Sequence, residues 1–83
     1  MTPRLQRATE ATLAAIRLQD EAVITLCYSA VIALAATDRP AELGLGSGVF
    51  TTLNRAIIEQ LGQHRVEPIK QAAWAYMENP NVQ

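Results

Sequence analysis

The amino-acid sequence predicts an all-α fold, organised as a single helical domain over residues 1–83. Apolar residues recur at helical spacing through most of the chain, and no Gly or Pro interrupts residues 4–37. The β-branched residues fall within this helical pattern, so no strand is expected. A composition of 49% hydrophobic and 18% charged residues is typical of an ordered globular chain. These observations predict a small helical bundle.

The first expected helix covers residues 3–37. Thr2 is suited to cap it, and Pro3 to occupy the first helical position, where the missing N–H would have no partner. The apolar pattern continues in phase through Gln19 and Asp20, which favours one continuous helix. The alternative is a break at this point, with Asp20 capping a second helix. At about 100° per residue, one face of the continuous helix carries Leu5, Leu13, Ile16, Val23, Cys27, Val31 and Leu34.

The segment Ala22–Thr37 contains no charged residue and is apolar around its whole circumference. A helix of this kind must be buried on all sides. A 35-residue helix would be about 52 Å long, whereas a globule of this size is about 30 Å across. Either the helix breaks, or a second copy of the chain covers it. We therefore expect a homo-oligomer, most simply a twofold dimer, with self-association through Val23, Cys27, Ala30, Val31 and Leu34.

The same segment is too short to be expected as a membrane span, because about 20 predominantly apolar residues are needed to cross a bilayer. It runs for 16 residues and includes polar side chains such as Thr25 and Ser29. No membrane partner is expected.

A connector over residues 38–48 is expected to lead into a C-terminal helical hairpin. Pro40 disfavours a helical conformation at the preceding residue, and Gly44, Gly46 and Gly48 follow. One helix is expected over residues 49–61, ended by a glycine cap at Gly62. The other is expected over residues 68–78, beginning at Pro68.

No motif in the chain indicates catalysis, a cofactor or a metal. The glycine-rich connector lacks both the strand of a dinucleotide fold and the Gly-Lys-Ser/Thr of a phosphate loop. Cys27 lies in the middle of the apolar segment, where a thiol behaves as a buried hydrophobe, and His64 lies in a polar turn. We therefore expect a non-enzymatic protein with no small-molecule substrate. A lone cysteine without a secretory signal suggests the cytoplasm.

The expected function is a protein–protein interaction module, such as an adaptor, inhibitor or regulatory subunit, acting as a homo-oligomer. A net charge of −1 without a basic cluster gives no reason to expect a nucleic-acid partner. The alternative is a small dimeric DNA-binding transcriptional regulator, in which the last helix would present Lys70 and Gln71. Trp74 lies on a polar face of that helix, so it either covers a neighbouring element or binds a partner. The expected surface for another protein consists of Trp74, Met77, Lys70 and Glu78.

Overall fold

The computed structural model describes residues 3–38 and 48–79, and in these ranges the chain is all-α without any strand. The all-α prediction is confirmed. Most of the expected connector 38–48 lies outside the described residues. The elements in order are α1 (Pro3–Leu18), α2 (Glu21–Asp38), α4 (Gly48–Leu61), the 3-10 turn η1 (Gln63–Arg65) and α5 (Val66–Glu78).

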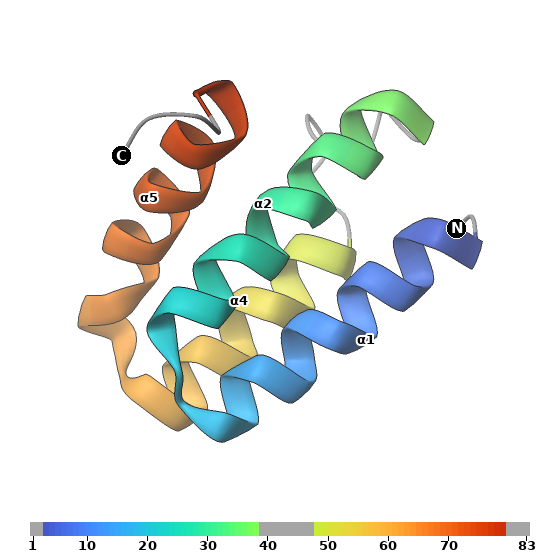
Figure 1. Cartoon of the computed structure of the whole chain (residues 1–83). Helices are drawn as coiled ribbons and strands as arrows, with labels where there is room; N and C mark the ends of the chain where they lie inside the picture. The colour runs from blue at the N-terminus through green and yellow to red at the C-terminus, as the bar shows by residue number, and fades with distance from the viewer. Residues whose placement is uncertain (1–2, 39–47, 80–83) are drawn as a thin grey trace.

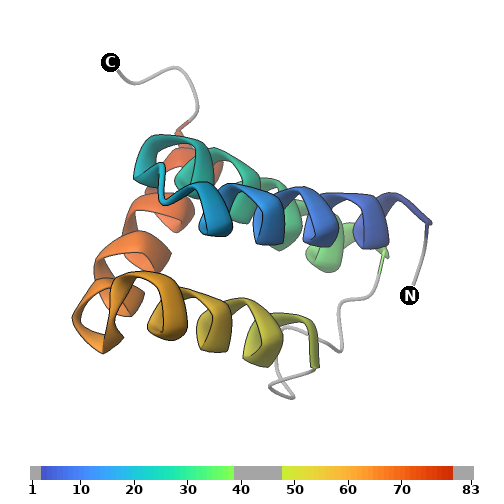
Figure 2. The ribbon, with the colours of Figure 1, turned by 90° about the horizontal axis from the view of Figure 1, so that it is seen from below.

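Helices α1 and α2 form a packed hairpin; α4, η1 and α5, which we call the second hairpin, dock on it, with α4 against α1, α5 against α2 and few contacts between α4 and α5. Helix α2 runs antiparallel to α1 and lies between α1 and α5 (Figure 1). Seen from below, α1 and α2 form one layer and α4 lies on the opposite side, in contact with α1 (Figure 2). The radius of gyration is 11.7 Å, with extents of 29 × 28 × 20 Å. No element of the molecule is therefore as long as the continuous helix that the sequence suggested.

The prediction of one continuous helix over residues 3–37 was wrong. The chain turns at Gln19, whose φ of 59° lies in the left-handed region. Asp20 then caps α2, because its side-chain Oδ1 accepts a hydrogen bond from the N–H of Val23 at 3.4 Å. The break lets α2 fold back and bury one side against its own chain, which an extended helix cannot do.

The second hairpin is close to what the sequence predicted. Helix α4 begins one residue earlier than expected and ends at Leu61 as expected. Gly62 has a φ of 106°, and its N–H bonds to the carbonyls of Ile57 and Ile58 at 3.1 and 3.0 Å. The prediction of a glycine cap is confirmed. Helix α5 begins two residues before Pro68, which therefore lies in its first turn, where proline is tolerated.

One hydrophobic core joins α1, α2, α4 and α5. Its buried apolar residues are Leu5, Ala15, Ile16, Ile24, Tyr28, Val31, Ile32, Ala35, Val49, Leu53, Ile57, Val66, Ile69 and Ala73. Helix α2 contributes more of these residues than any other helix. The first reason for expecting a second copy, a long uncovered helix, therefore no longer applies, and any case for self-association must come from the surface.

Candidate interaction surface

Helix α2 is apolar on two opposite sides, and residues 3–38 and 48–79 cover only one of them. Ile24, Tyr28, Val31 and Ala35 recur at spacings of three and four residues and are all buried. A second row at the same kind of spacing consists of Val23, Leu26, Ala30 and Ala33, and all four of these residues are exposed. We call this second row the outward face of α2. Its spacing is that of a helix-pairing seam.

Large hydrophobic side chains gather at the N-terminal end of the outward face. Val23 and Leu26 are 40% and 46% exposed, and Leu18, at the end of α1, is 78% exposed. Ala11 and Ala14 precede Leu18 at helical spacing on α1 and are also exposed. An exposed single leucine is ordinary, but a row of apolar residues on two adjacent helices is a feature of interaction surfaces.

Two side-chain contacts fix the corner between α1 and α2. The amide of Gln19 donates a hydrogen bond to the backbone carbonyl of Gln60 at 3.0 Å. The carboxylate of Glu21 accepts two hydrogen bonds from the Arg65 guanidinium, at 2.6 and 2.8 Å. The Arg65 guanidinium holds the pKa of the Glu21 carboxyl below its ordinary value. These contacts attach the first corner to the second hairpin and so help set the direction of α2.

A buried tyrosine fixes the rotation of α2 about its axis. The hydroxyl of Tyr28 donates a hydrogen bond to Oδ1 of Asn54 on α4 at 2.8 Å. Its ring lies 6.1 Å from the ring of Phe50, centroid to centroid. Burial raises the pKa of Tyr28 to about 12. Because Tyr28 must point inward to make these contacts, the outward face is held toward solvent.

The residues expected to mediate self-association do not share one environment. Val23 and Ala30 lie on the outward face. Cys27 and Leu34 are partly buried and pack against the core, and Val31 is fully buried within the chain. Only the first two are therefore accessible to a second copy.

The residues expected to bind another protein lie on α5 in mixed surroundings. Trp74 is 40% exposed, whereas Met77 is partly buried and packs against the core. The Lys70 ammonium lies 3.4 Å from a carboxylate oxygen of Glu67, and Glu78 is exposed. The structure thus leaves Trp74 accessible, with Lys70 one helical turn before it and Glu78 one turn after it.

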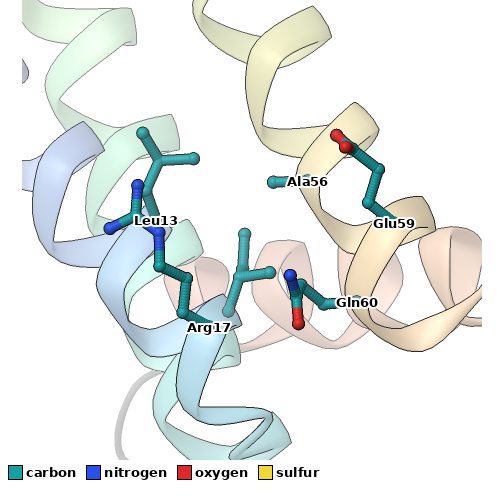
Figure 3. Close-up of a pocket in the computed structure, with 6 residues that line it drawn as sticks. Leu13, Arg17, Ala56, Glu59 and Gln60 are labelled. Carbon is teal, nitrogen blue, oxygen red and sulfur yellow. The ribbon is translucent and has the colours of Figure 1, made fainter.

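A hollow of about 190 Å³ lies between α1 and α4. In Figure 3, Arg17 extends along α1 beside Leu13, and Glu59 lies across the hollow on α4. The polar side chains at its rim, those of Arg17, Glu59 and Gln60, are exposed. The hollow is lined by polar as well as apolar side chains, whereas ligand pockets are lined mainly by apolar ones. Its lining residues are Leu13, Ile16, Arg17, Ala56, Glu59 and Gln60.

The other side chains that could react or bind a metal do not lie close together. Cys27 is partly buried on α2, and His64 is exposed in η1. Within residues 3–38 and 48–79, no three His, Cys, Asp or Glu side chains come together as a metal-binding group. None of the helices in this part of the chain combines the length and hydropathy required to span a membrane. The glycines at positions 44 and 46 lie outside the described residues.

Two residues of the exposed surface were missed in the sequence. Leu26 could have been found from the spacing of Val23, Leu26, Ala30 and Ala33, which repeats at three and four residues. Leu18 could not, because its exposure depends on the break at Gln19 that the apolar pattern did not reveal.

Comparisons with protein-family models, with curated proteins and with solved structures gave no match to this chain.

Proposed function

We propose that the protein is a non-enzymatic protein–protein interaction module that acts as a homo-oligomer in the cytoplasm, with the outward face of α2 as its main binding surface. An adaptor, an inhibitor or a regulatory subunit would each use such a surface. The observation that carries this proposal is the exposed row Val23, Leu26, Ala30 and Ala33 on a helix whose opposite side already forms the core.

The outward face is not needed to stabilise the monomer. The inward row of α2 supplies the buried residues, including Tyr28 and Val31, and polar residues on the outward side would leave that core intact. Solvent-facing helix positions in a monomeric protein are usually polar or charged. No charged residue occurs between Glu21 and Asp38. An apolar outward face exposed to water for no purpose would only favour aggregation.

Trp74 supports a second, smaller contact with a different protein. Its side chain is 40% exposed, and Lys70 precedes it by one turn of α5. Trp residues surrounded by polar groups are common anchors in protein interfaces. In an adaptor, the outward face of α2 and the Trp74 region would bind two different surfaces.

The alternative of DNA binding has less support from the arrangement of α5. A recognition helix needs free cationic or amide side chains near its start. Lys70 instead lies 3.4 Å from Glu67, and Glu67 and Glu78 add negative charge to the same helix.

The proposal is tested by placing a photoreactive amino acid at position 26 in the full chain, expressed in cells, and identifying the covalent adducts after irradiation. The matched control carries the same amino acid at Ile58 of α4, which is 39% exposed. We expect protein adducts, with a second copy or another protein, from position 26 and few from position 58. Absence of protein adducts at position 26, or adducts with nucleic acid, would contradict the proposal.

A further inference from the structure

The outward face of α2 has a direction, because its side chains decrease in size along the helix. Val23 and Leu26 occupy the N-terminal half, and Ala30 and Ala33 occupy the C-terminal half. All of them face solvent. A surface with a raised half and a recessed half fits a copy of itself only in one orientation.

We propose that this face binds a second copy of the chain, with the two α2 helices antiparallel and crossing near Ala30. A twofold axis through this point places Leu26 of one copy within one residue of Ala33 of the other, and Val23 opposite Thr37. Each large side chain then meets a small one. This inference rests on the proposed function, since it names the partner of the same surface.

A parallel pair would pack less well. A twofold axis along the helices would place Leu26 on Leu26 and Ala33 on Ala33, so that the helices would be held apart at one end and leave a gap at the other. Unfilled space of this kind forfeits contacts that close packing provides. Alanines at the crossing point allow the two helices to approach closely in the antiparallel arrangement.

The area of the face is adequate for a small dimer. Helix α2 has 18 residues and is therefore about 27 Å long. Together with α1, which packs beside it, the layer is about 20 Å wide, which gives a flat footprint of roughly 540 Å². The accessible area is larger than this projection, and specific interfaces begin at roughly 600 Å² per partner.

The absence of charge on the face favours a second copy. In a twofold pair, a charged residue near the axis lies opposite its own copy, and the repulsion between the two like charges disfavours pairing. Here the axis passes through Ala30, and the helix has no charge between Glu21 and Asp38. The α2 helices of two copies can therefore meet without burying an unpaired charge of their own.

The first test is the mass of the full chain in solution, measured by light scattering from about 10 µM to about 1 mM, a range that covers weak dimers. We expect a rise from 9.0 kDa toward twice that value. Leu26→Glu should weaken self-association about tenfold or more, because it places two carboxylates in the contact. The control Ile58→Glu, at a similarly exposed residue of α4, should leave the mass unchanged. Circular dichroism establishes that both variants remain helical.

The second test determines the orientation. In a chain carrying Cys27→Ala, the additional change Ala30→Cys should give a disulfide-linked dimer under mild oxidation, because the two Cα atoms face each other across the axis. Val23→Cys should not, because antiparallel pairing about Ala30 places the two copies of residue 23 about 21 Å apart along the helices. Equal cross-linking at both positions would indicate a parallel pair and overturn the proposed orientation.

The failure of this inference can be distinguished from failure of the proposed function. A chain that stays at 9.0 kDa throughout the concentration range overturns the second copy as partner and, with it, the homo-oligomeric part of the proposed function, but not the interaction module itself. If the photoreactive residue at position 26 then gives adducts only with other proteins, the surface still binds protein, but its partner is a different one.

Discussion

The two helical hairpins of this protein are built in different ways. Helices α1 and α2 pack against each other extensively, whereas α4 and α5 make few contacts with each other beyond their connection. Helix α4 packs on α1, and α5 packs on α2 (Figures 1 and 2). The first hairpin is therefore the platform of the fold, and the second consists of two arms that dock on it.

The corners of the two hairpins also differ in what determines their conformation. The α4–η1 corner is formed by Gly62, whose φ of 106° a glycine adopts without steric cost. The α1–α2 corner uses Gln19 at a φ of 59°, which is unfavourable for a residue with a side chain. Gln19 and Glu21 bind Gln60 and Arg65 of the second hairpin. The α4–η1 corner therefore follows from the backbone preference of Gly62 itself, whereas the α1–α2 corner is held by contacts with residues distant in the chain.

The largest expected effect comes from placing a charge inside the platform. Val31→Glu should unfold the protein, since Val31 has no exposed surface and an unpaired carboxylate there costs at least about 4 kcal/mol. Val23→Glu, on the outward face of the same helix, should keep its helix content. Circular dichroism distinguishes the two. A folded Val31→Glu protein would mean that α2 is not the centre of the core.

The next largest effect is expected from substitutions at the two corners, which should differ in their cost. Gly62→Ala should lower the free energy of unfolding by about 1–3 kcal/mol, because alanine is strained at this φ and its Cβ would lie 2.8 Å from Cε1 of His64. Gln19→Gly should change it by less than about 1 kcal/mol, since relief of the positive φ offsets the lost bond to Gln60. Urea denaturation measures both. A larger loss for Gln19→Gly would show that the tertiary contact outweighs the backbone conformation.

A smaller effect is expected at the link between the platform and α4. Tyr28→Phe should cost about 1 kcal/mol at neutral pH through loss of the hydrogen bond to Asn54. Because burial raises the pKa of Tyr28 to about 12, its contribution is fully present below pH 10 and is lost as the pH rises toward 12.

The free energy of unfolding of the unmodified chain should therefore fall over this pH interval, and less so in Tyr28→Phe. Tyr76→Phe is the matched control, because Tyr76 is exposed and its removal should leave the alkaline decline unchanged. An identical pH profile in all three proteins would contradict the assignment to Tyr28.

The smallest effect on stability is expected at Trp74 of α5. Trp74→Ala should shift the free energy of unfolding by no more than about 0.5 kcal/mol, because Trp74 is exposed and lies outside the core. The same change should weaken any protein contact centred on this residue by roughly 30-fold. Thermal unfolding monitored by circular dichroism measures the first effect. A large loss of stability would place Trp74 in the fold, and its role in binding would have to be abandoned.

The sequence predicted the second hairpin better than the first for a physical reason. Gly62 and Pro68 are local signals, because their own backbone preferences restrict the conformation wherever they occur. The break at Gln19 has no such signal. The apolar pattern ran through it in phase, and Asp20 was identified only as an alternative cap. Its geometry depends on Gln60 and Arg65, which lie more than 40 residues away in the chain.

The candidate surface was predicted in part for a similar reason. The lack of charge between Ala22 and Thr37 indicated that α2 has no polar side. It could not show which side the chain covers, so Val31 and Val23 were assigned to the same surface although one is buried and the other exposed.

The sequence by itself determined the helical class, the glycine-capped second corner and the presence of a helix with more apolar surface than one side can bury. These follow from local backbone preferences and from the periodicity of side chains along a helix. Only the tertiary structure decided where the first helix breaks and which row of α2 faces water. Both depend on contacts between residues distant in the chain, above all Tyr28 with Asn54 and Glu21 with Arg65, whose energies no local pattern contains.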